Sequence, residues 1–98
     1  MTIKVYEKDG SSVIVPEGKI DHVTVGEFEK TIREAGNNDR LLTLDMAGVE
    51  YVSSAALRAI LVANDMKEGK GGLVITNVNN KVMEIFRITG FSDYLNIC

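Results

Sequence analysis

Two adjacent hydroxyl side chains, Ser53 and Ser54, are the groups of this sequence whose position most favours chemistry. They follow a short apolar run, Val49 to Val52, and precede a helical pattern that continues through Leu57. A serine at a helix start lies near unpaired backbone N–H groups and the positive end of the helix dipole, which stabilise anions. One serine can therefore be an N-cap that contributes about 1 kcal/mol. Alternatively, one can carry a phosphate, which adds about −1.5 to −2 charge.

A phosphate at this helix start would change binding more than folding. The exposed dipole contributes only about 0.3–1 kcal/mol, whereas burying an unpaired dianion against a partner costs several kcal/mol. A difference of about 1.4 kcal/mol is tenfold in affinity. A phosphorylated serine here would act as an on/off control of association.

The residue types of a nucleophilic triad are present, but their order does not make a triad. Ser54, His22 and either Asp21 or Asp45 would supply a nucleophile, a base and an orienting acid. The serine lacks the G-x-S-x-G elbow, and the chain has no P-loop for nucleotide phosphates. The single histidine and the single cysteine, Cys98, support neither a metal cage nor a disulfide framework. We therefore expect no enzyme, no metal site and no cofactor, while nucleotide binding stays open.

Length and composition restrict the class of protein. The 98 residues, 45% of them hydrophobic, predict one domain over residues 1–98. The formal net charge is −3 and no Lys/Arg cluster is present, which argues against nucleic acid as a partner. The longest apolar run falls far short of the roughly 20 residues that span a bilayer, and the start, MTIKVYEKDG, lacks the apolar segment of a signal peptide. We expect a cytoplasmic protein with no membrane segment.

The elements that would position the serines begin with a hairpin. Ile3 to Glu7 alternates apolar and polar residues, and Asp9-Gly10 is a turn signal before a second run, Val13 to Val15. Pro16 has no N–H to donate, so we expect it to end this ladder or to lie at an edge.

A first helix is predicted after Asp21. Thr24 and Glu27 match a capping box, and Val23 and Phe28 occupy its hydrophobic staple positions. Gly36-Asn37-Asn38 is expected to end this helix as a left-handed C-cap region.

The remaining segments alternate between strand and helix. Leu41 to Met46 predicts a buried strand, the serine pair begins a helix that stops near 67–72, and Leu73 to Ile75 predicts another strand. Asn79 or Asn80 then caps a third helix that ends at Gly90, and Tyr94 to Ile97 is expected as a last short edge strand. The order β-β-α-β-α-β-α-β predicts an α/β domain with a mixed, mostly parallel sheet and helices packed against it.

Three segments of the chain together resemble the STAS domain of anti-sigma factor antagonists. Gly18 to Asp21 resembles the family's turn before the first helix. Leu44 to Met46, followed by Val49 to Leu57, resembles its strand, aspartate and helix start. Val82 to Phe91 is similar to its closing helix and glycine turn. The resemblance covers nearly the whole chain.

The resemblance implies a protein that switches partners. In the family, the unphosphorylated domain binds an anti-sigma factor that is also a serine kinase, and so frees the sigma factor. The kinase phosphorylates the domain at the helix start and ends the interaction, and a phosphoserine phosphatase resets it. The acceptor position falls on Ser54, Ser53 takes a position where many members carry Asp, and Ala56 one usually held by Gly. The added methyl of Ala56 is expected to hinder close approach of a kinase to the backbone.

Asp21 and Asp45 match family positions near the acceptor serine. A carboxylate there can hydrogen-bond the hydroxyl or shape the kinase contact. The alternative for both is a structural role, in which Asp21 satisfies turn amides and Asp45 caps a strand end.

A second function stays open at this point. A soluble STAS accessory subunit of a lipid or anion transporter would use the same fold as a binding module and would need no phosphorylation. The identity of the partner, a kinase or an ATP-binding transport subunit, separates the two.

Overall fold

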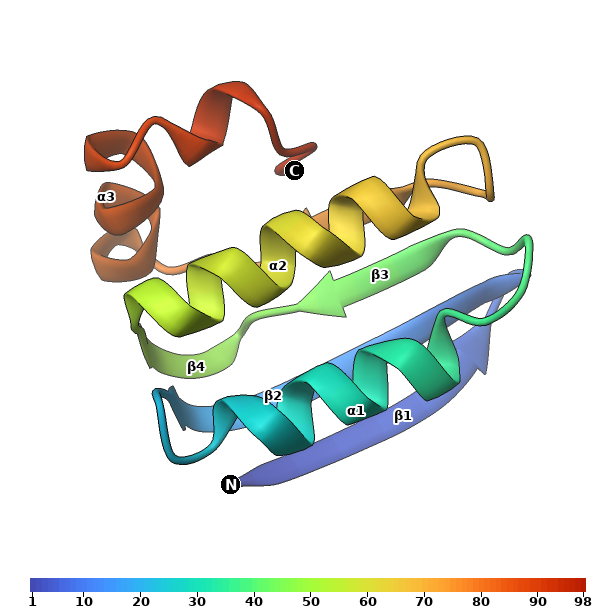
Figure 1. Ribbon diagram of the computed structural model, residues 1–98, viewed down its shortest axis with the longest axis horizontal. Helices are drawn as coiled ribbons and strands as arrows, with labels where there is room; N and C mark the ends of the chain where they lie inside the picture. Colours follow the sequence, from blue (N-terminus) through green and yellow to red (C-terminus); the bar gives the residue numbers. More distant parts are fainter.

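The computed structural model describes residues 1–98 and begins with the predicted antiparallel hairpin (Figure 1). Strands β1 (Thr2–Lys8) and β2 (Ser11–Ile20) pair along their whole length, from Thr2 opposite Glu17 to Lys8 opposite Ser11. The alternating pattern and the turn signal are local, which is why the sequence predicts this unit well.

Strand β2 is much longer than predicted, because Pro16 does not end it. Pro16 lies opposite Ile3 within the hairpin, and β2 continues to Ile20. On its other side, β2 pairs with one strand over Ser12–Ile14 and with another over Glu17–Ile20. On this side of β2, Pro16 falls between the two stretches and has no registered partner, so its missing N–H interrupts no pairing there.

The sheet has five strands in the order β1-β2-β3-β5, with β4 also paired to β2. Strands β3 (Leu42–Asp45), β4 (Gly48–Val52) and β5 (Leu73–Thr76) add parallel pairings, so that only the first hairpin is antiparallel. Strand β4 was missing from the predicted order. Its short run becomes a strand because β2 extends past Pro16 to pair with it.

The register of β2 against β4 shifts between Gly18 and Lys19. Gly18 has φ of 100°, a conformation that favours glycine. A bulge of this kind redirects the strand, and here it precedes the turn into α1.

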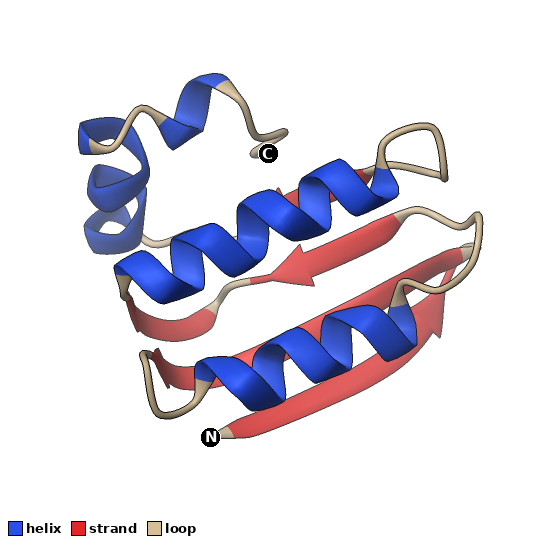
Figure 2. Cartoon of the chain, in the orientation of Figure 1, coloured by secondary structure: helices blue, strands red, loops and turns tan.

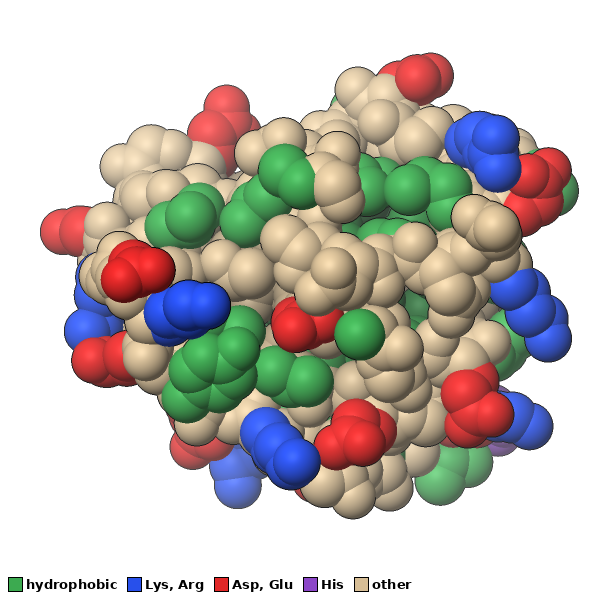
Figure 3. Space-filling model, turned by 180° about the vertical axis from the view of Figure 1, so that it is seen from behind, with side chains coloured by type: hydrophobic (Ala, Val, Ile, Leu, Met, Phe, Trp, Pro, Cys, Tyr) green, Lys and Arg blue, Asp and Glu red, His purple; other side chains and the backbone are tan.

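Helices α1 (Val25–Ala35) and α2 (Ser54–Lys67) lie side by side over one face of the sheet (Figures 1 and 2). The third helix, α3 (Asn80–Ile88), lies beyond the start of α2 and contacts β4. Figure 3 shows the molecule from behind, where hydrophobic side chains are separated by charged ones. None of the helices combines the length and the apolar character that a membrane span needs.

Gly36 ends α1 for a reason other than the predicted one. Its φ of −93° is not left-handed. A Cβ at this position would lie 2.8 Å from the carbonyl oxygen of Ile32 and 2.8 Å from Cε of Met66. Glycine is favoured here mainly by the backbone carbonyl of Ile32, which cannot move aside, whereas Met66 of α2 meets the position only with the flexible end of its side chain.

The C-terminal segment differs from the predicted edge strand. Residues Phe91–Asp93 form a short 3-10 helix, η1, after Gly90, whose φ of 79° ends α3 as expected. Only one residue of the predicted strand, Ile97, pairs with the sheet, through an isolated parallel bridge to Ile75. The C-terminal segment therefore lies beside the sheet as predicted, but it pairs with β5 at one residue and does not form a strand.

Candidate functional site

Ser53 is the N-cap of α2. Its Oγ accepts a hydrogen bond from the backbone N–H of Ala56 at 3.2 Å, and its carbonyl oxygen accepts from Leu57 N–H at 2.9 Å. Ser53 is extended, with φ −83° and ψ 174°, as a capping residue should be. Of the two predicted roles for the serine pair, capping belongs to Ser53.

Ser54 is the first residue of α2, and its side chain is exposed. Because Ser53 supplies the cap, the Ser54 hydroxyl is not needed to hold the helix start. The first turn of α2 carries no acidic residue, so no side-chain carboxylate already occupies the positive end of its dipole. The structure therefore presents an accessible hydroxyl at a helix end that favours an anion.

Asp21 organises the turn before α1. Its Oδ1 accepts from the backbone N–H groups of Val23 at 2.9 Å and Thr24 at 3.1 Å, and from the Thr24 hydroxyl at 3.3 Å. The N–H of Thr24, followed by that of Val23, lowers the pKa of Asp21 below its ordinary value near 3.8. Asp21 is therefore ionised at neutral pH.

This arrangement replaces the predicted capping box. Thr24 is the N-cap residue of α1, but its Oγ1 makes no capping bond to the helix. It accepts from Asp21 N–H at 2.9 Å and donates to the Lys19 carbonyl at 2.8 Å. The predicted hydrophobic staple is also wrong, because Val23 is 76% exposed while Phe28 is buried. Aspartate, two positions before Val23, competes successfully for the same backbone donors.

Backbone pairing joins the Asp21 turn to the serine pair. Val52 is the registered partner of Ile20, and the N–H of Ser53 donates to the Ile20 carbonyl at 2.9 Å. In the chain, Asp21 directly follows the acceptor residue Ile20, and Ser54 directly follows the donor residue Ser53. The ends of β2 and β4 thus hold an ionised carboxylate and an accessible hydroxyl on neighbouring segments.

Asp45 occupies a different place. It ends β3, and its Oδ1 accepts from Ala47 N–H and from the side-chain amide of Asn77, both at 3.1 Å. These bonds connect the loops that follow β3 and β5. Strand β4 lies between Asp45 and the serine pair, and no hydrogen bond joins them. The structure does not bring this carboxylate to Ser54 and gives it the role of a turn acceptor.

Ala56 also lies away from the exposed side of the helix start. It is fully buried and belongs to the hydrophobic core. Because its methyl is buried, it does not itself lie on the surface that a protein meets when it approaches Ser54 from solvent. The effect of Ala56 on a kinase stays a prediction.

A shallow polar hollow of about 480 Å³ includes Asp21. It is also lined by Lys19, Glu50, Tyr51 and Lys81. Lys19 and Tyr51 are registered partners across β2 and β4. The sequence analysis did not identify these residues. A prediction of β4 as a strand beside the end of β2 would have placed Lys19 and Tyr51 together.

His22, the only histidine, is exposed next to Asp21. Its charge is a minor contributor to the lowered pKa of that carboxyl. The triad residue types are thus distributed over separate parts of the chain, with His22 in the turn before α1, Asp45 at the end of β3 and Ser54 at the start of α2.

The domain thus combines a mixed five-stranded sheet with an exposed serine, Ser54, directly after the N-cap Ser53 of its second helix. The family model described as the STAS domain matches residues 2–98. The chain therefore belongs to the STAS domain family.

Two sequence relatives carry names that describe antagonists. One is BtrV of Bordetella bronchiseptica, a candidate anti-sigma factor antagonist, which is 28% identical over 93 residues. That match covers 93% of this chain and 80% of BtrV. The other is the anti-sigma-F factor antagonist RsfB of Mycobacterium tuberculosis, which is 32% identical over 71 residues. This second match covers 71% of the chain and 57% of RsfB.

Solved structures share the fold. An anti-sigma factor antagonist from Mycobacterium paratuberculosis superposes with a TM-score of 0.90 at 23% identity, over 98% of this chain and 83% of that one. The antagonist SpoIIAA in its unphosphorylated form gives a TM-score of 0.78 at 15% identity, over 99% and 88% of the two chains. Murine Slc26a9, an anion transporter, gives 0.71 at 20% identity, over 84% of this chain and 14% of the transporter.

Proposed function

We propose that this STAS domain is an anti-sigma factor antagonist controlled by phosphorylation of Ser54. Unphosphorylated, it binds an anti-sigma factor that has serine kinase activity, and phosphorylation releases it. A phosphoserine phosphatase restores the binding form. The observation that carries the proposal is the division of labour at the start of α2, where Ser53 caps the helix and Ser54 stays exposed.

The energetics favour a switch of binding over a switch of folding. A phosphate on Ser54 lies at the positive end of α2, where it stabilises the helix by about 0.3–1 kcal/mol. The fold is therefore retained. In the complex, the same dianion would be buried against a partner without a matching cation, which costs several kcal/mol.

Asp21 contributes a fixed negative charge beside the serine segment. Its three hydrogen bonds all end on Oδ1, and none of them uses Oδ2. We propose that Oδ2 contacts the kinase or the Ser54 hydroxyl before phosphate transfer. After transfer, the carboxylate and the phosphate place two negative charges on neighbouring segments, and a partner that covers both must bury more uncompensated charge, which adds to the loss of affinity.

The names of the relatives support this proposal. RsfB is named as an antagonist of the anti-sigma-F factor. SpoIIAA has been solved in unphosphorylated and phosphorylated forms, with TM-scores to this chain of 0.78 and 0.72. Both forms resemble the present structure, as a switch that leaves the fold intact requires.

The direct experiment combines the purified chain, ATP and each anti-sigma factor kinase of the source organism in turn. Peptide mass spectrometry should find one phosphate, on Ser54. Ser53→Ala should still be phosphorylated, and Ser54→Ala should not. A phosphate on Ser53 would show that the proposal names the wrong serine. If no kinase adds a phosphate, the proposed regulation is wrong.

The alternative function, an accessory STAS subunit of a lipid or anion transporter, rests on the fold shared with Slc26a9. It predicts that the unphosphorylated protein is isolated from its native cells with an ATP-binding transport subunit. Isolation with an anti-sigma factor kinase supports the antagonist function instead.

A further inference from the structure

The rest of the chain covers two edges of the sheet and leaves strand β1 uncovered. Beyond β5, Ile75 N–H donates to Asn96 O and Ile75 O accepts from Cys98 N–H, both at 2.9 Å. Beside β4, helix α3 packs against the strand, and the side-chain amide of Asn79 donates to Val49 O at 2.8 Å. Strand β1 pairs with β2 alone and lies at the margin of the sheet (Figure 1). The outer backbone groups of β1 therefore have no strand partner within the chain.

Strand β1 is long and regular for an edge. Its seven residues pair with β2 without a register shift, and it contains no proline. Edges that avoid other chains are commonly short, bulged, interrupted by proline or charged with lysine. Here Lys4 is paired with Glu17 at 3.8 Å and Glu7 with Arg40 at 2.7 Å, while Lys8 is the last residue of the strand. The charges in the middle of this edge are thus compensated within the chain, and its backbone groups stay available to another strand.

Apolar side chains of β1 are exposed on both faces of the sheet. Val5 is 51% exposed although its partner on β2, Ile14, is fully buried. On the opposite face, Tyr6 is 46% exposed beside its buried partner Val13. The cover of these side chains therefore stops at β2. Another strand placed beside β1 would remove more of Val5 and Tyr6 from water, which favours its binding.

A second copy of the chain can supply this strand with two-fold symmetry. Two antiparallel β1 strands are related by a two-fold axis normal to the sheet, and this operation keeps every side chain on its own face. Successive side chains of a strand alternate between the faces. Residues that lie opposite each other are therefore the same residue or differ by an even number of positions. The axis must then pass beside a residue and not between two residues.

Length and charge select Val5 as the residue at the axis. With the axis at Val5, all seven residues of β1 find a partner and no two charges of the same sign lie opposite each other. Lys4 then lies opposite Tyr6, where an ammonium can contact the face of the ring. An axis at Lys4 would place that lysine opposite its own copy, and an axis at Tyr6 would place it opposite Lys8. Like charges directly opposite each other are destabilising.

We propose that the chain forms a weak dimer in which β1 pairs antiparallel with β1 of a second copy, with the two-fold axis at Val5. The two sheets join into one continuous sheet. A strand of seven residues offers a smaller interface than the about 800 Å² per partner of a stable complex, so the dimer dissociates on dilution. Strand β2 lies between β1 and β4, which leads to Ser54, so the interface does not include the serine segment.

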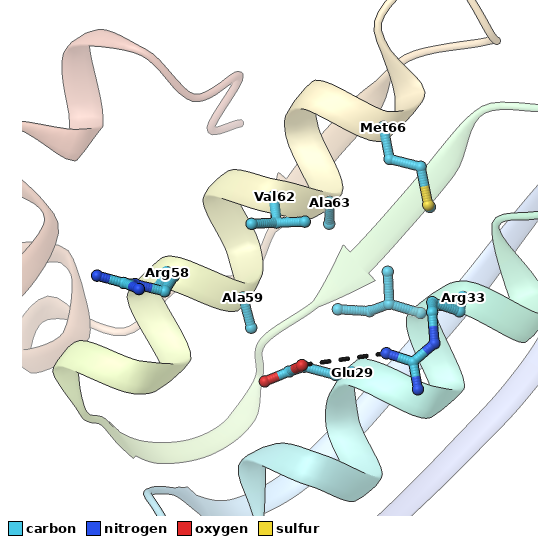
Figure 4. A pocket seen from close by; sticks show the side chains of 8 residues that line it. Glu29, Arg33, Arg58, Ala59, Val62, Ala63 and Met66 are labelled. Carbon is cyan, nitrogen blue, oxygen red and sulfur yellow. Dashed lines mark ion pairs between the residues drawn. The ribbon is translucent and has the colours of Figure 1, made fainter.

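The first test is analytical ultracentrifugation of the full chain at increasing concentration. The native protein should pass reversibly from the monomer mass to the dimer mass. Val5→Lys places two ammonium groups at the axis and should raise the dissociation constant at least about tenfold. The matched control is Val62→Lys, because Val62 is a similarly exposed valine at the rim of the hollow between α1 and α2 (Figure 4). This control should dimerise like the native protein, and circular dichroism should show the native fold in both variants.

A disulfide tests the register itself. Cys98→Ser first removes the free, exposed cysteine, and Val5→Cys then places one thiol of each copy at the axis. Directly opposite residues have Cα atoms about 4.5–5.5 Å apart, a separation that a disulfide spans, so oxidised glutathione should produce a covalent dimer. Tyr6→Cys in the same background is the control. Its two thiols lie on a diagonal of about 7–8 Å, beyond the usual reach of a disulfide, and should cross-link much less.

Four results would overturn the proposal. A native protein that stays monomeric at every concentration would exclude the dimer, and a dimer that Val5→Lys leaves unchanged would exclude β1 as its interface. A dimer that dissociates in Val62→Lys would instead place the second copy on the side of α1 and α2. Equal cross-linking of Val5→Cys and Tyr6→Cys would contradict the register at Val5. None of these measurements depends on Ser54 or on an anti-sigma factor.

Discussion

The two ends of α2 differ in how they are fastened to the rest of the domain. At the start, one short side chain, Ser53, caps the helix, and the next residue, Ser54, is exposed. At the end, Lys67 is fully buried and its Nζ donates to Gly36 O at 3.2 Å and to Asn38 O at 2.8 Å. These carbonyls follow the end of α1, so Lys67 ties the two helices together.

Under the proposed function, this difference would separate the tasks of regulation and stability within one helix. A helix start that keeps only a small cap can accept a charged group without loss of its anchoring bonds. The end, in contrast, depends on a buried ammonium that donates to two carbonyls, of which Gly36 O also accepts from the N–H of Asn38 at 2.9 Å. Changes at the end should therefore affect folding, and changes at the start should affect binding.

The largest effect on stability is expected for Lys67→Met. This substitution keeps the apolar stem but removes the hydrogen bonds to Gly36 O and Asn38 O. Gly36 O keeps its hydrogen bond from Asn38 N–H, but Asn38 O loses the ammonium donor, which should lower the free energy of unfolding by about 1–3 kcal/mol in urea denaturation. Lys70→Met, at an exposed position three residues later, is the control and should stay within about 0.5 kcal/mol of the native protein. Equal stability of the two variants would show that the end of α2 does not depend on Lys67.

The largest effect on binding is expected for Ser54→Asp. A carboxylate at the start of α2 should weaken binding to the anti-sigma factor by at least about tenfold, since it places an uncompensated charge in the interface. Isothermal titration calorimetry measures the change, and Asn80→Asp at the first residue of α3 provides a matched charge on another helix start. Unchanged affinity for Ser54→Asp would count against electrostatic exclusion.

A smaller effect on stability is expected for Ser53→Ala. Loss of the hydrogen bond from Ala56 N–H should lower the free energy of unfolding by about 1 kcal/mol. Ser54→Ala should change it by less, because Ser54 is not the cap. If the thermal unfolding midpoints of the two variants fall in the reverse order, the roles of the serines have been interchanged.

The smallest effect is expected from pH at the Asp21 turn. The pKa of Asp21 is lower in the folded chain than its ordinary value near 3.8, so its ionised form stabilises the fold at neutral pH. This contribution is complete above that value and is lost as pH falls through the folded pKa. The difference in melting temperature between native protein and Asp21→Asn should therefore shrink in acid. If the difference in melting temperature between the two proteins stays constant with pH, the charge of Asp21 does not contribute to stability.

Local patterns predicted the parts of the fold that local interactions form. The hairpin, the order of helices and the position of Ser53 and Ser54 at a helix start all follow from turn residues, periodicity and capping preferences. The choice between the two serines required the structure, because adjacent serines satisfy the same pattern.

The remaining features depend on residues far apart in the sequence. Strand β4 exists because β2 runs beside it, and Lys67 is buried because its acceptors, Gly36 and Asn38, lie 31 and 29 residues away. At the start of α1, two local patterns competed for the same backbone donors, and the aspartate turn replaced the capping box. For Asp45 the sequence left two roles open, and its hydrogen bonds to Ala47 N–H and the Asn77 amide support the structural one.

The central claim is that Ser54, and not its neighbour, carries the switch. The most direct measurement is peptide mass spectrometry of native protein, Ser53→Ala and Ser54→Ala after incubation with ATP and the anti-sigma factor kinase that binds the native chain. The account predicts one phosphate on Ser54 in the first two proteins and none in the third. Phosphate on Ser54→Ala, or its loss from a folded Ser53→Ala, would contradict the account.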